Sequence, residues 1–321
     1  MTVNQQTLQQ GLHLCLNSTD LDWLGTKQEG KVRDSYSLSD GTRLIVTTDR
    51  ISAFDRSIGT LPFKGQVLNQ LAAWWFEQSK DLVPNHFLER VDPAAMKVIE
   101  CTPLPVEFVM RAYLTGVTST SVWTHYEKGE RIFCGHTLPD GLVHNGPLPK
   151  AILTPSTKAE HGGHDQSVSR EELLKANVIG AKDFDQVADF AHRLFAFGQA
   201  HCAKQGLILV DTKYEFGKTS DGTIVLIDEV HTPDSSRFWF ASSYKQRLEA
   251  GLAPESFDKE YLRAWLKGQG FIGEGAVPTL PDDVRIEAAR RYIQACESIY
   301  GQAFIPDLQE PHDRLRKNLS S

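Results

Sequence analysis

The sequence DTKYEFGKTSDGTIVLIDEVHTPDSSRFW, residues 211–239, places six carboxylates among three cations in a pattern typical of a β-hairpin. Apolar runs flank the dipeptide Asp221-Gly222, which suits a tight turn between two strands. A two-residue turn there, or a four-residue loop over 220–223, gives a single strand register. In that register Glu215 is predicted to face Asp228.

The acids of this hairpin are predicted to share one face. Side chains alternate along a strand, so Asp211, Lys213 and Glu215 lie on one side, and Asp228 joins them from the neighbouring strand. Opposed carboxylates repel each other, which indicates a cation between them. Carboxylates combined with waters and phosphate oxygens are typical of Mg²⁺ beside a nucleotide, and the absence of His and Cys on this face disfavours zinc.

Two alternatives to a metal site stay open at this point. Lys213 lies between two acids and would neutralise them without any metal. An odd-numbered turn would shift the register and remove the predicted pairing.

The turn after the hairpin, TPDSSR at 232–237, places Asp234, Ser235 and Arg237 beside the predicted ion. Hydroxyls and a guanidinium suit a phosphate or a carboxylate, which Arg binds through two parallel hydrogen bonds. The alternative is a plain solvent-exposed turn.

Composition excludes several classes of protein. A formal net charge of −7 argues against a general nucleic-acid binder, because such binding depends on clustered Lys and Arg. The five cysteines lie far apart without a C-x-x-C pair, so neither a disulfide framework nor a zinc knuckle is indicated. No apolar run is long enough to span a bilayer, and no signal peptide is recognisable. A cytoplasmic protein without a membrane partner is expected.

The periodicity of the chain predicts an α+β protein of two lobes, since 321 residues exceed a typical single domain. The first lobe, 1–112, contains a hairpin turning at Asp40-Gly41, a helix over 65–80 and a further strand. The second lobe, 113–321, opens with an irregular excursion over 119–170. Three helices follow, one from a predicted N-cap at Asp183 to Gly206 that packs under the acidic hairpin, and two near 261–267 and 284–300.

Several sequence blocks, in order, resemble one family, the SAICAR synthetases. The matching blocks are EGKVRDSY (29–36), TDRISAFD (48–55), LNQLAAWWF (68–76), PVEFVMRAYLTG (105–116), LTPSTKAEHGGHD (153–165), LVDTKYEFG (209–217) and IDEVHTPDSSRFW (227–239). The resemblance implies a ligase that uses ATP and Mg²⁺ to join L-aspartate to the carboxylate of carboxyaminoimidazole ribotide (CAIR) in purine biosynthesis, through an acyl phosphate. It also implies a two-lobed fold that is ATP-grasp-like or kinase-like.

The resemblance implies roles for individual residues. Asp211 and Lys213 are expected near the reacting carboxylate, and Glu215 and Asp228 at the metal. The ATP-binding residues are expected to be Lys31, Arg33, Glu107 and Met110, with a core role as the alternative for Met110. The substrate-binding residues are expected to be Arg111 and Arg237 on the ribotide phosphate, together with Ser52, Asp55, Lys158, Asp234 and Ser235.

The sequence also departs from the family pattern. Val117 follows Gly116 where the family often has Ser, so a hydroxyl from Thr118 or Ser119 is expected instead. Gln166-Ser167 replaces a Glu-Asn pair, and acidic contacts there are not expected.

Two rival functions remain at this stage. A small-molecule kinase needs the same acids and cations, but the motifs G-x-G-x-x-G and H-R-D are missing. A catalytically silent nucleotide-binding module is disfavoured because Lys31, Lys213, Glu215 and Asp228 are all present. The sequence leaves open the aspartate pocket, the order of substrate binding and the number of metal ions. It also leaves open the oligomeric state, with a monomer slightly favoured.

Overall fold

A computed structural model describes residues 3–54, 56–118, 120–157, 166–257 and 260–320. Two residues with expected roles, Asp55 and Lys158, lie outside the described residues, as does Ser119.

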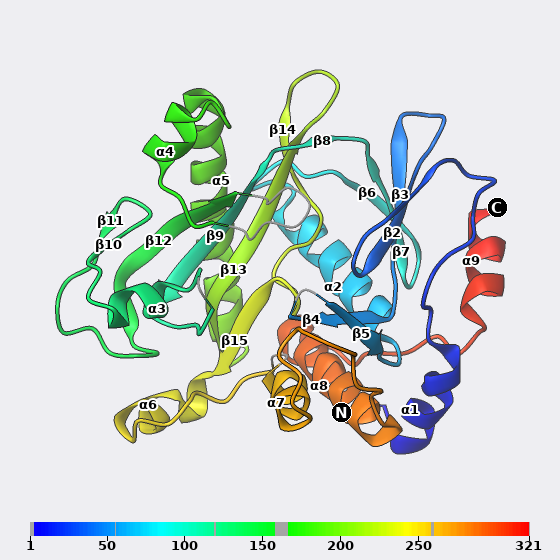
Figure 1. Ribbon diagram of the computed structural model, residues 1–321. Helices are drawn as coiled ribbons and strands as arrows, with labels where there is room; N and C mark the ends of the chain where they lie inside the picture. The colour runs from blue at the N-terminus through cyan, green and yellow to red at the C-terminus, as the bar shows by residue number, and fades with distance from the viewer. Residues whose placement is uncertain (1–2, 55, 119, 158–165, 258–259, 321) are drawn as a thin grey trace.

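The first of two large sheets is antiparallel and has the strand order β1-β2-β3-β7-β6 (Figure 1). Its strands are β1 (Lys27–Glu29), β2 (Arg33–Ser37), β3 (Thr42–Thr47), β6 (Phe87–Asp92) and β7 (Ala95–Ile99). The predicted turn at Asp40-Gly41 joins β2 to β3, where Gly41 has a φ of 78° that suits glycine. A separate hairpin, β4 (Arg50–Ala53) and β5 (Arg56–Thr60), follows.

The second sheet is built around the long strand β13. It has the order β12-β9-β13-β14, and β15 and β8 also pair with β13. Its strands are β8 (Thr102–Pro103), β9 (Val106–Tyr113), β12 (Pro147–Thr157), β13 (Leu207–Lys218), β14 (Ile224–Ile227) and β15 (Ser236–Phe240). Helix α5 (Ala181–Lys204) packs on one face of β13, as predicted. Its Phe184 meets Phe108, and its Phe190 meets Phe216.

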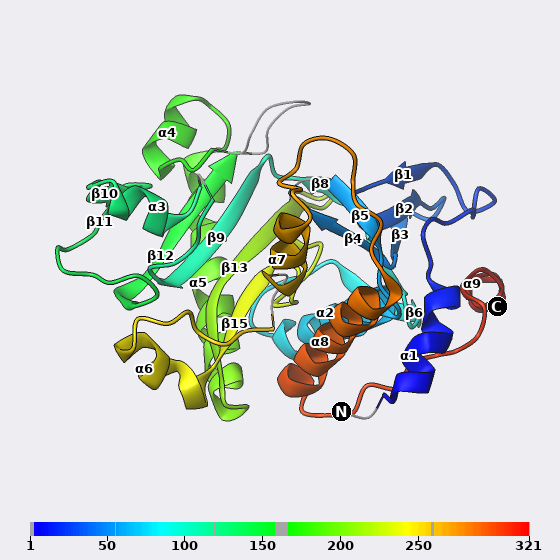
Figure 2. The same cartoon turned by 60° about the horizontal axis from the view of Figure 1, so that its bottom comes forward.

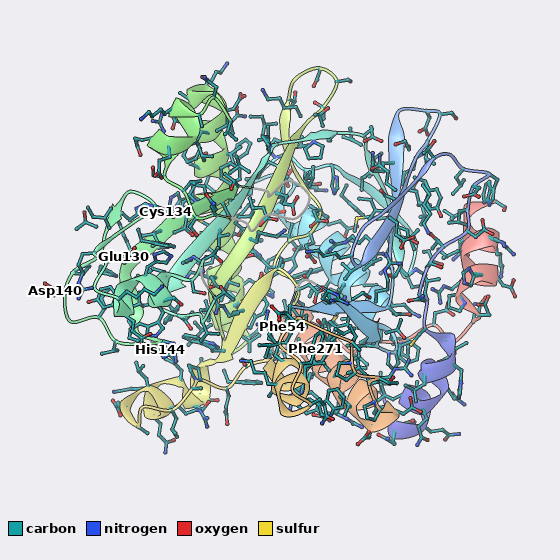
Figure 3. The ribbon with its side chains drawn as sticks, viewed as in Figure 1. Phe54, Glu130, Cys134, Asp140, His144 and Phe271 are labelled. Atoms are coloured by element: carbon teal, nitrogen blue, oxygen red, sulfur yellow. The ribbon has the colours of Figure 1, made fainter. Side chains whose placement is uncertain are left out.

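The remaining elements frame these sheets. They are α1 (Gln5–Gly11), the 3₁₀ helix η1 (Leu12–Leu14), α2 (Lys64–Ser79), α3 (Val122–Glu127), β10 (Ile132–Phe133), β11 (His136–Thr137), α4 (Arg170–Lys175), α6 (Ala241–Glu249), α7 (Glu260–Gly268), α8 (Asp282–Tyr300) and α9 (Pro311–Leu319). Among the described residues, none of these helices has both the length and the apolar content that crossing a membrane requires. The segment around β10 and β11, which carries Glu130, Cys134 and Asp140, lies on the opposite side of the molecule from α9 (Figure 3).

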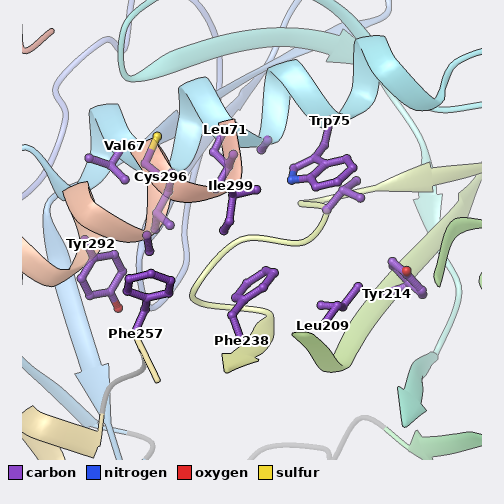
Figure 4. Packing of buried hydrophobic residues seen from close by; sticks show 14 of the residues in the cluster. Val67, Leu71, Trp75, Leu209, Tyr214, Phe238, Phe257, Tyr292, Cys296 and Ile299 are labelled. Carbon is purple, nitrogen blue, oxygen red and sulfur yellow. The ribbon is translucent and has the colours of Figure 1, made fainter. Parts of the chain in front are cut away.

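One hydrophobic core runs through both parts of the chain. Val67, Leu71 and Trp75 of α2 lie close to Cys296 and Ile299 of α8, and the same core extends to Leu209 and Phe238 of the second sheet (Figure 4). Figure 2 shows α8 lying along α2 with α7 beside it. Further along the chain, Phe271 packs edge-on against Phe54, with ring centroids 6.1 Å apart (Figure 3).

Two element predictions need correction. The excursion over 119–170 contains β12, an 11-residue edge strand whose prolines at 147, 149 and 155 obscured its strand character. An edge strand tolerates proline because its outer N–H groups need no partner strand. Helix α5 is capped by Gly180, and Asp183 lies in its first turn, where a carboxylate favours the helix dipole.

The predicted pairing of Glu215 with Asp228 is wrong, because the hairpin turn is odd-numbered. Glu215 pairs with Ile227. Thr219 N–H donates to Thr223 O at 3.0 Å and Gly222 N–H donates to Thr219 O at 2.9 Å, which leaves a three-residue loop over 220–222. Gly222 supplies the left-handed φ of 86° that such a loop requires at its third position.

The expected lobe boundary at 112/113 falls inside β9, a strand of the second sheet. The division of the chain into 1–112 and 113–321 stays a prediction.

Candidate active site

A row of charged side chains, formed by Asp211, Lys213 and Glu215 of β13 and the charged residues that contact them, crosses the second sheet on the face opposite α5. The register places Asp211 of β13 level with Arg111 of β9 and with Arg237 of β15. Arg237 Nε lies 2.9 Å and 3.1 Å from the two carboxylate oxygens of Asp211, and Arg111 Nη1 lies 3.5 Å from Oδ2. Burial lowers the pKa of Arg111, and the charge of Asp211 opposes that effect. Asp211 therefore orients two guanidinium groups that point along one face.

Lys213 lies two residues further along the same face and bridges two acids. Its Nζ is 2.8 Å from Glu107 Oε1 and 2.5 Å from Glu215 Oε1. Burial alone would lower the pKa of Lys213, but the charges of Glu215 and Glu107 outweigh it and raise the pKa. Both acids therefore favour the protonated, positively charged form of Lys213.

Asp228 lies on this face because of its backbone conformation and not because of the strand register. It follows the last residue of β14 and has a left-handed φ of 67°, so its side chain does not continue the alternation of the strand. Arg33 of β2 donates from Nη1 to Asp228 Oδ1 at 2.7 Å, and Arg33 Nη2 lies 2.8 Å from Glu229 Oε2. Burial raises the pKa of Asp228 to about 6, with Arg33 opposing and Glu215 adding to the rise. Glu215 and Asp228 are thus electrostatic neighbours although they are not paired across the strands.

These two carboxylates suit part of a magnesium site. Both line one cavity, and a divalent cation would relieve their repulsion and the cost of their burial. Among the described residues, no group of three or more His, Cys, Asp or Glu side chains is placed to hold a metal. An ion here therefore needs oxygens from a bound ligand such as a nucleotide phosphate.

The larger cavity near the charged row has a volume of about 500 Å³, within the usual range for ligand pockets. The first sheet contributes Arg33, Arg43 and Ile45 to its wall, and the second contributes Glu215 and Asp228. Its remaining lining residues are Gln28, Glu29, Gly30, Ser35, His86, Glu100, Cys101, Pro103 and Ile227. A cavity between the two sheets with apolar and charged walls suits a nucleotide.

A smaller cavity of about 260 Å³ lies at the other end of the row. Asp211 and Glu215 are four residues apart on β13, so the two ends of the row are separated by roughly 13 Å. The lining residues of the smaller cavity are Arg111, Val117, Thr118, Ser121, Asp211, Pro233, Asp234, Ser235, Ser236, Arg237 and Arg263. Three guanidinium groups and four hydroxyls suit a phosphate ester.

Gly116 makes room for this cavity. It has a φ of 100°, and a Cβ there would lie 2.3 Å from Ser121 Oγ and 3.3 Å from Arg237 Nη1. Thr118, one of the two hydroxyls expected after Gly116, lines the cavity, and Ser121 adds a hydroxyl that was not expected.

Other expected site residues lie elsewhere or have other partners. Met110 is fully buried on the α5 face of β9, which favours its core alternative. Lys31 is exposed in the β1–β2 loop, and Ser52 lies in β4; neither lines the two cavities described above. Arg33 contacts acids of the protein, and Asp234 contacts Lys64 and Tyr292.

Arg263 of α7 is a cavity residue that sequence reasoning missed. The sequence predicts only a helix near 261–267, and no local pattern in it indicates which of its residues reaches a site built from β9, β13 and β15.

Comparison with known proteins decides the family. The model of the SAICAR synthetase family matches residues 26–277 of this chain. The chain belongs to the SAICAR synthetase family. The mixed helix-and-sheet class expected from the sequence is confirmed with it.

Individual relatives resemble the chain over most of its length. A putative phosphoribosylaminoimidazole-succinocarboxamide synthase 2 of Mesorhizobium japonicum is 49% identical over 293 residues, which covers 91% of this chain and 94% of the relative. The chloroplastic phosphoribosylaminoimidazole-succinocarboxamide synthase of Arabidopsis thaliana is 46% identical, covering 98% of this chain and 77% of the relative. The solved structure of SAICAR synthase from Saccharomyces cerevisiae complexed with SAICAR has a TM-score of 0.78 at 32% identity, covering 91% of this chain and 100% of that one.

Proposed function

We propose that this protein is an ATP-dependent ligase of purine biosynthesis that joins L-aspartate to the carboxylate of CAIR, giving the succinocarboxamide ribotide SAICAR, ADP and phosphate. The observation that carries the proposal is one charged sheet face with a cavity at each end. The acid pair Glu215 and Asp228 lines the cavity suited to a nucleotide, and Arg111 and Arg237 line the cavity suited to a phosphate ester.

The chemistry explains why such a face is needed. A free carboxylate does not react with an amine, so it is first phosphorylated by the γ-phosphoryl group of ATP, and ADP leaves. The aspartate amine then attacks the acyl carbon, phosphate departs with the C–O bond electrons, and the new amide nitrogen loses a proton. Phosphoryl transfer depends mainly on positioning and charge neutralisation.

Each charged group on the face has a proposed part in this reaction. Arg111 and Arg237 hold the ribotide phosphate, and Asp211 fixes the direction of both guanidinium groups. Lys213 lies between the cavities and neutralises negative charge on the carboxylate while it is phosphorylated. Ser235 adds a hydroxyl to the phosphate-ester cavity, and Asp234 shapes its wall.

Glu215 and Asp228 would hold Mg²⁺, which would neutralise the phosphates of ATP. Lys31 and Glu107 remain proposed contacts of the nucleotide, and Ser52, Asp55 and Lys158 remain proposed contacts of the ribotide or of aspartate. Arg33 holds Asp228 and Glu229 and also lines the nucleotide cavity, so it too remains a proposed contact of ATP. We assign Met110 to the core.

The finer architecture belongs to the same proposal. A two-lobed, ATP-grasp-like arrangement is supported by the position of the larger cavity between the two sheets. A cytoplasmic location and a monomeric state also remain proposals.

An omission experiment tests the function. The purified protein is mixed with Mg-ATP, CAIR and aspartate, each component is omitted in turn, and ADP and SAICAR are quantified together. We expect both products only in the complete mixture. A phosphorylated product that accumulates without aspartate consumption would instead favour the small-molecule kinase.

A further inference from the structure

A lysine buried beneath the smaller cavity has no part in the chemistry described so far. Lys64 is the first residue of α2 and its side chain is 0% exposed. Its Nζ lies 2.8 Å from Asp234 Oδ2, and the hydroxyl of Tyr292 on α8 donates to Asp234 Oδ1 at 2.6 Å. A buried ammonium group is costly unless it is paired, so this contact is strongly favoured once both groups are inside.

Asp234 connects this buried pair to the cavity. Its side chain is only 6% exposed, yet it lines the cavity with Arg111 and Arg237. Its backbone N–H donates to Thr232 Oγ1 at 3.2 Å, and the N–H of Thr232 donates to Ser235 Oγ at 3.2 Å. Asp234 is therefore part of the hydrogen-bonded turn that presents Ser235 and Arg237, and its carboxylate joins that turn to Lys64.

The charges of the cavity favour a role for Lys64 in ligand binding. Among the described lining residues, Arg111, Arg237 and Arg263 face two carboxylates, Asp211 and Asp234, which leaves an excess of one positive charge. Lys64 raises that excess to two. A phosphate monoester carries about −1.5 to −2 near neutral pH, so counting Lys64 with the lining residues brings their net charge to the opposite of the ligand's.

We propose that Lys64 is a positioning residue for the smaller cavity: from inside the protein it neutralises Asp234, holds that carboxylate away from the ligand and gives the cavity the positive charge that balances a phosphate dianion. Lys64 does not touch the ligand. The proposal rests on the proposed function, in which this cavity binds the ribotide phosphate.

The proposal predicts a characteristic pH dependence for a variant without the lysine. A buried carboxylate that loses its cation repels a phosphate, and it takes up a proton more readily as the pH falls. The other charged or titratable groups around Asp234 include Tyr292 of α8, Arg263 of α7, Arg33 of β2, Arg237 of β15 and Glu229 of the preceding segment. Lys64 also faces Asp49, whose pKa burial raises to about 6 and the charge of Lys64 lowers. Asp49 is present in every variant, so only a comparison of variants that differ at Asp234 isolates the effect of Asp234. Burial, with the charge of Asp234 adding to it, raises the pKa of Tyr292, so this hydroxyl stays protonated throughout the experiment.

The decisive variant is Lys64→Met, which keeps the unbranched shape and most of the length of the side chain and removes its charge. We expect the KM for CAIR at about pH 8 to rise by about tenfold or more, while the KM for ATP changes little. The ratio to the wild-type value should shrink as the pH falls towards about 6. The matched control is Lys80→Met, which removes an exposed lysine at the end of the same helix and should change neither constant.

A double variant separates charge from packing. In Lys64→Met/Asp234→Asn the unpaired carboxylate is gone, so CAIR binding should recover relative to Lys64→Met and its added pH dependence should disappear. A double variant no better than Lys64→Met at every pH would overturn the proposal, and so would equal increases of the CAIR and ATP constants.

A binding measurement keeps the test independent of catalysis and of the folding of Lys64→Met. Calorimetry with ribose 5-phosphate should show weaker binding to Lys64→Met than to the wild type. If that variant does not fold, Tyr292→Phe should show a smaller loss in the same direction, and unchanged binding there would overturn the proposal. A wild type that binds ribose 5-phosphate but makes no SAICAR would contradict the proposed function alone, and a wild type that does not bind it would overturn the role of Lys64.

Discussion

Asp228 shows at the scale of one residue how this site depends on a break in regular structure. Its neighbour Ile227 pairs with Glu215, so in a continuous strand Asp228 would point to the opposite face. The left-handed φ of 67° after the end of β14 redirects its side chain. Asp tolerates this conformation better than most residues do.

Replacing this carboxylate is the most direct test of the acid pair. Asp228→Asn should lower kcat by about 100-fold or more and weaken the dependence of the rate on Mg²⁺, because half of the acid pair is lost. The circular dichroism spectrum should not change. Asp221→Asn, at the exposed tip of the same hairpin, is the control for loss of an acid and should keep its activity. Undiminished turnover by Asp228→Asn would remove Asp228 from the metal site.

The raised pKa of Asp228 predicts how magnesium binding depends on pH. The folded-state pKa of about 6 lies above the ordinary value of 3.8, so the contribution of this group to stability is full below about pH 4 and is lost as the pH rises through about 6. Metal ligands must be deprotonated, so Mg²⁺ should bind more weakly as the pH falls through the same range. The stabilisation by Mg-ADP over ADP with a chelator, measured by thermal unfolding, should therefore be larger at about pH 7.5 than at about pH 5.5. Asp228→Asn should reduce that difference, leaving only the part that comes from protonation of ADP itself, and an equal effect at both pH values in the wild type would contradict the assignment.

At this scale the sequence predicts which side chains share a face better than it predicts their pairing. Alternation along β13 correctly groups Asp211, Lys213 and Glu215, because the period of two is a property of any strand. The pairing of Glu215 depends on whether Gly222 belongs to the loop, which local sequence does not determine. The position of Arg263 depends on how α7 packs against the rest of the protein, and the sequence of α7 alone does not predict that packing.

At the scale of elements, β13 organises the molecule. It pairs with β9 and β8 along one edge and with β15 and β14 along the other. One of its faces carries the charged row, and its other face packs Tyr214 and Phe216 into the core. Two cavities can therefore share one rigid face.

The turn of the acidic hairpin provides a test of the register. Gly222→Ala places a Cβ at a φ of 86° and should destabilise the protein by about 1 to 2 kcal/mol, with little change in kcat at low temperature. Ser220→Ala, in the same loop, is the control and should be nearly neutral. Thermal unfolding of the three proteins measures both effects. A Gly222→Ala variant as stable as the wild type would contradict the three-residue turn on which the observed register depends.

Long periodic elements were predictable and irregular ones were not. The helices near 65–80, 183–206 and 284–300 follow from apolar spacing, because each buries one stripe in the core. β12 escaped prediction because its prolines are tolerated only at a sheet edge, and edge position is a property of the whole sheet.

At the scale of the whole molecule, helix α9 near the end of the chain packs against the first sheet. Helix α9 lies against β6, where Arg314 Nε and Nη2 donate to the carboxylate of Asp92 at 3.0 Å and 3.2 Å. Both side chains are almost fully buried, and Asn318 donates to the same carboxylate at 2.8 Å. Leu315 joins Tyr36 and Leu44 in a second core cluster. The C-terminal helix thus holds the edge of the first sheet.

Breaking this buried pair should affect the whole fold. Arg314→Met leaves Asp92 buried without its cation and should cost about 3 to 5 kcal/mol of unfolding free energy. Arg316→Met, on the exposed side of the same helix, should cost little. Chemical denaturation measures both. Equal stability of the two variants would mean that the docking of α9 does not depend on the Arg314–Asp92 pair.

The general class of the fold and its strand-rich first part follow from sequence periodicity, but the way the two sheets share one core does not. α2 and α8 are far apart in sequence and pack against each other, so the core that unites the sheets depends on long-range contacts.

A crystal structure of the protein with Mg²⁺, ADP and CAIR would locate both ligands at once. We expect ADP between the two sheets with its magnesium on Glu215 and Asp228, and the phosphate of CAIR between Arg111 and Arg237. A nucleotide bound elsewhere, or a ribotide phosphate held by residues away from this charged face, would contradict this expectation.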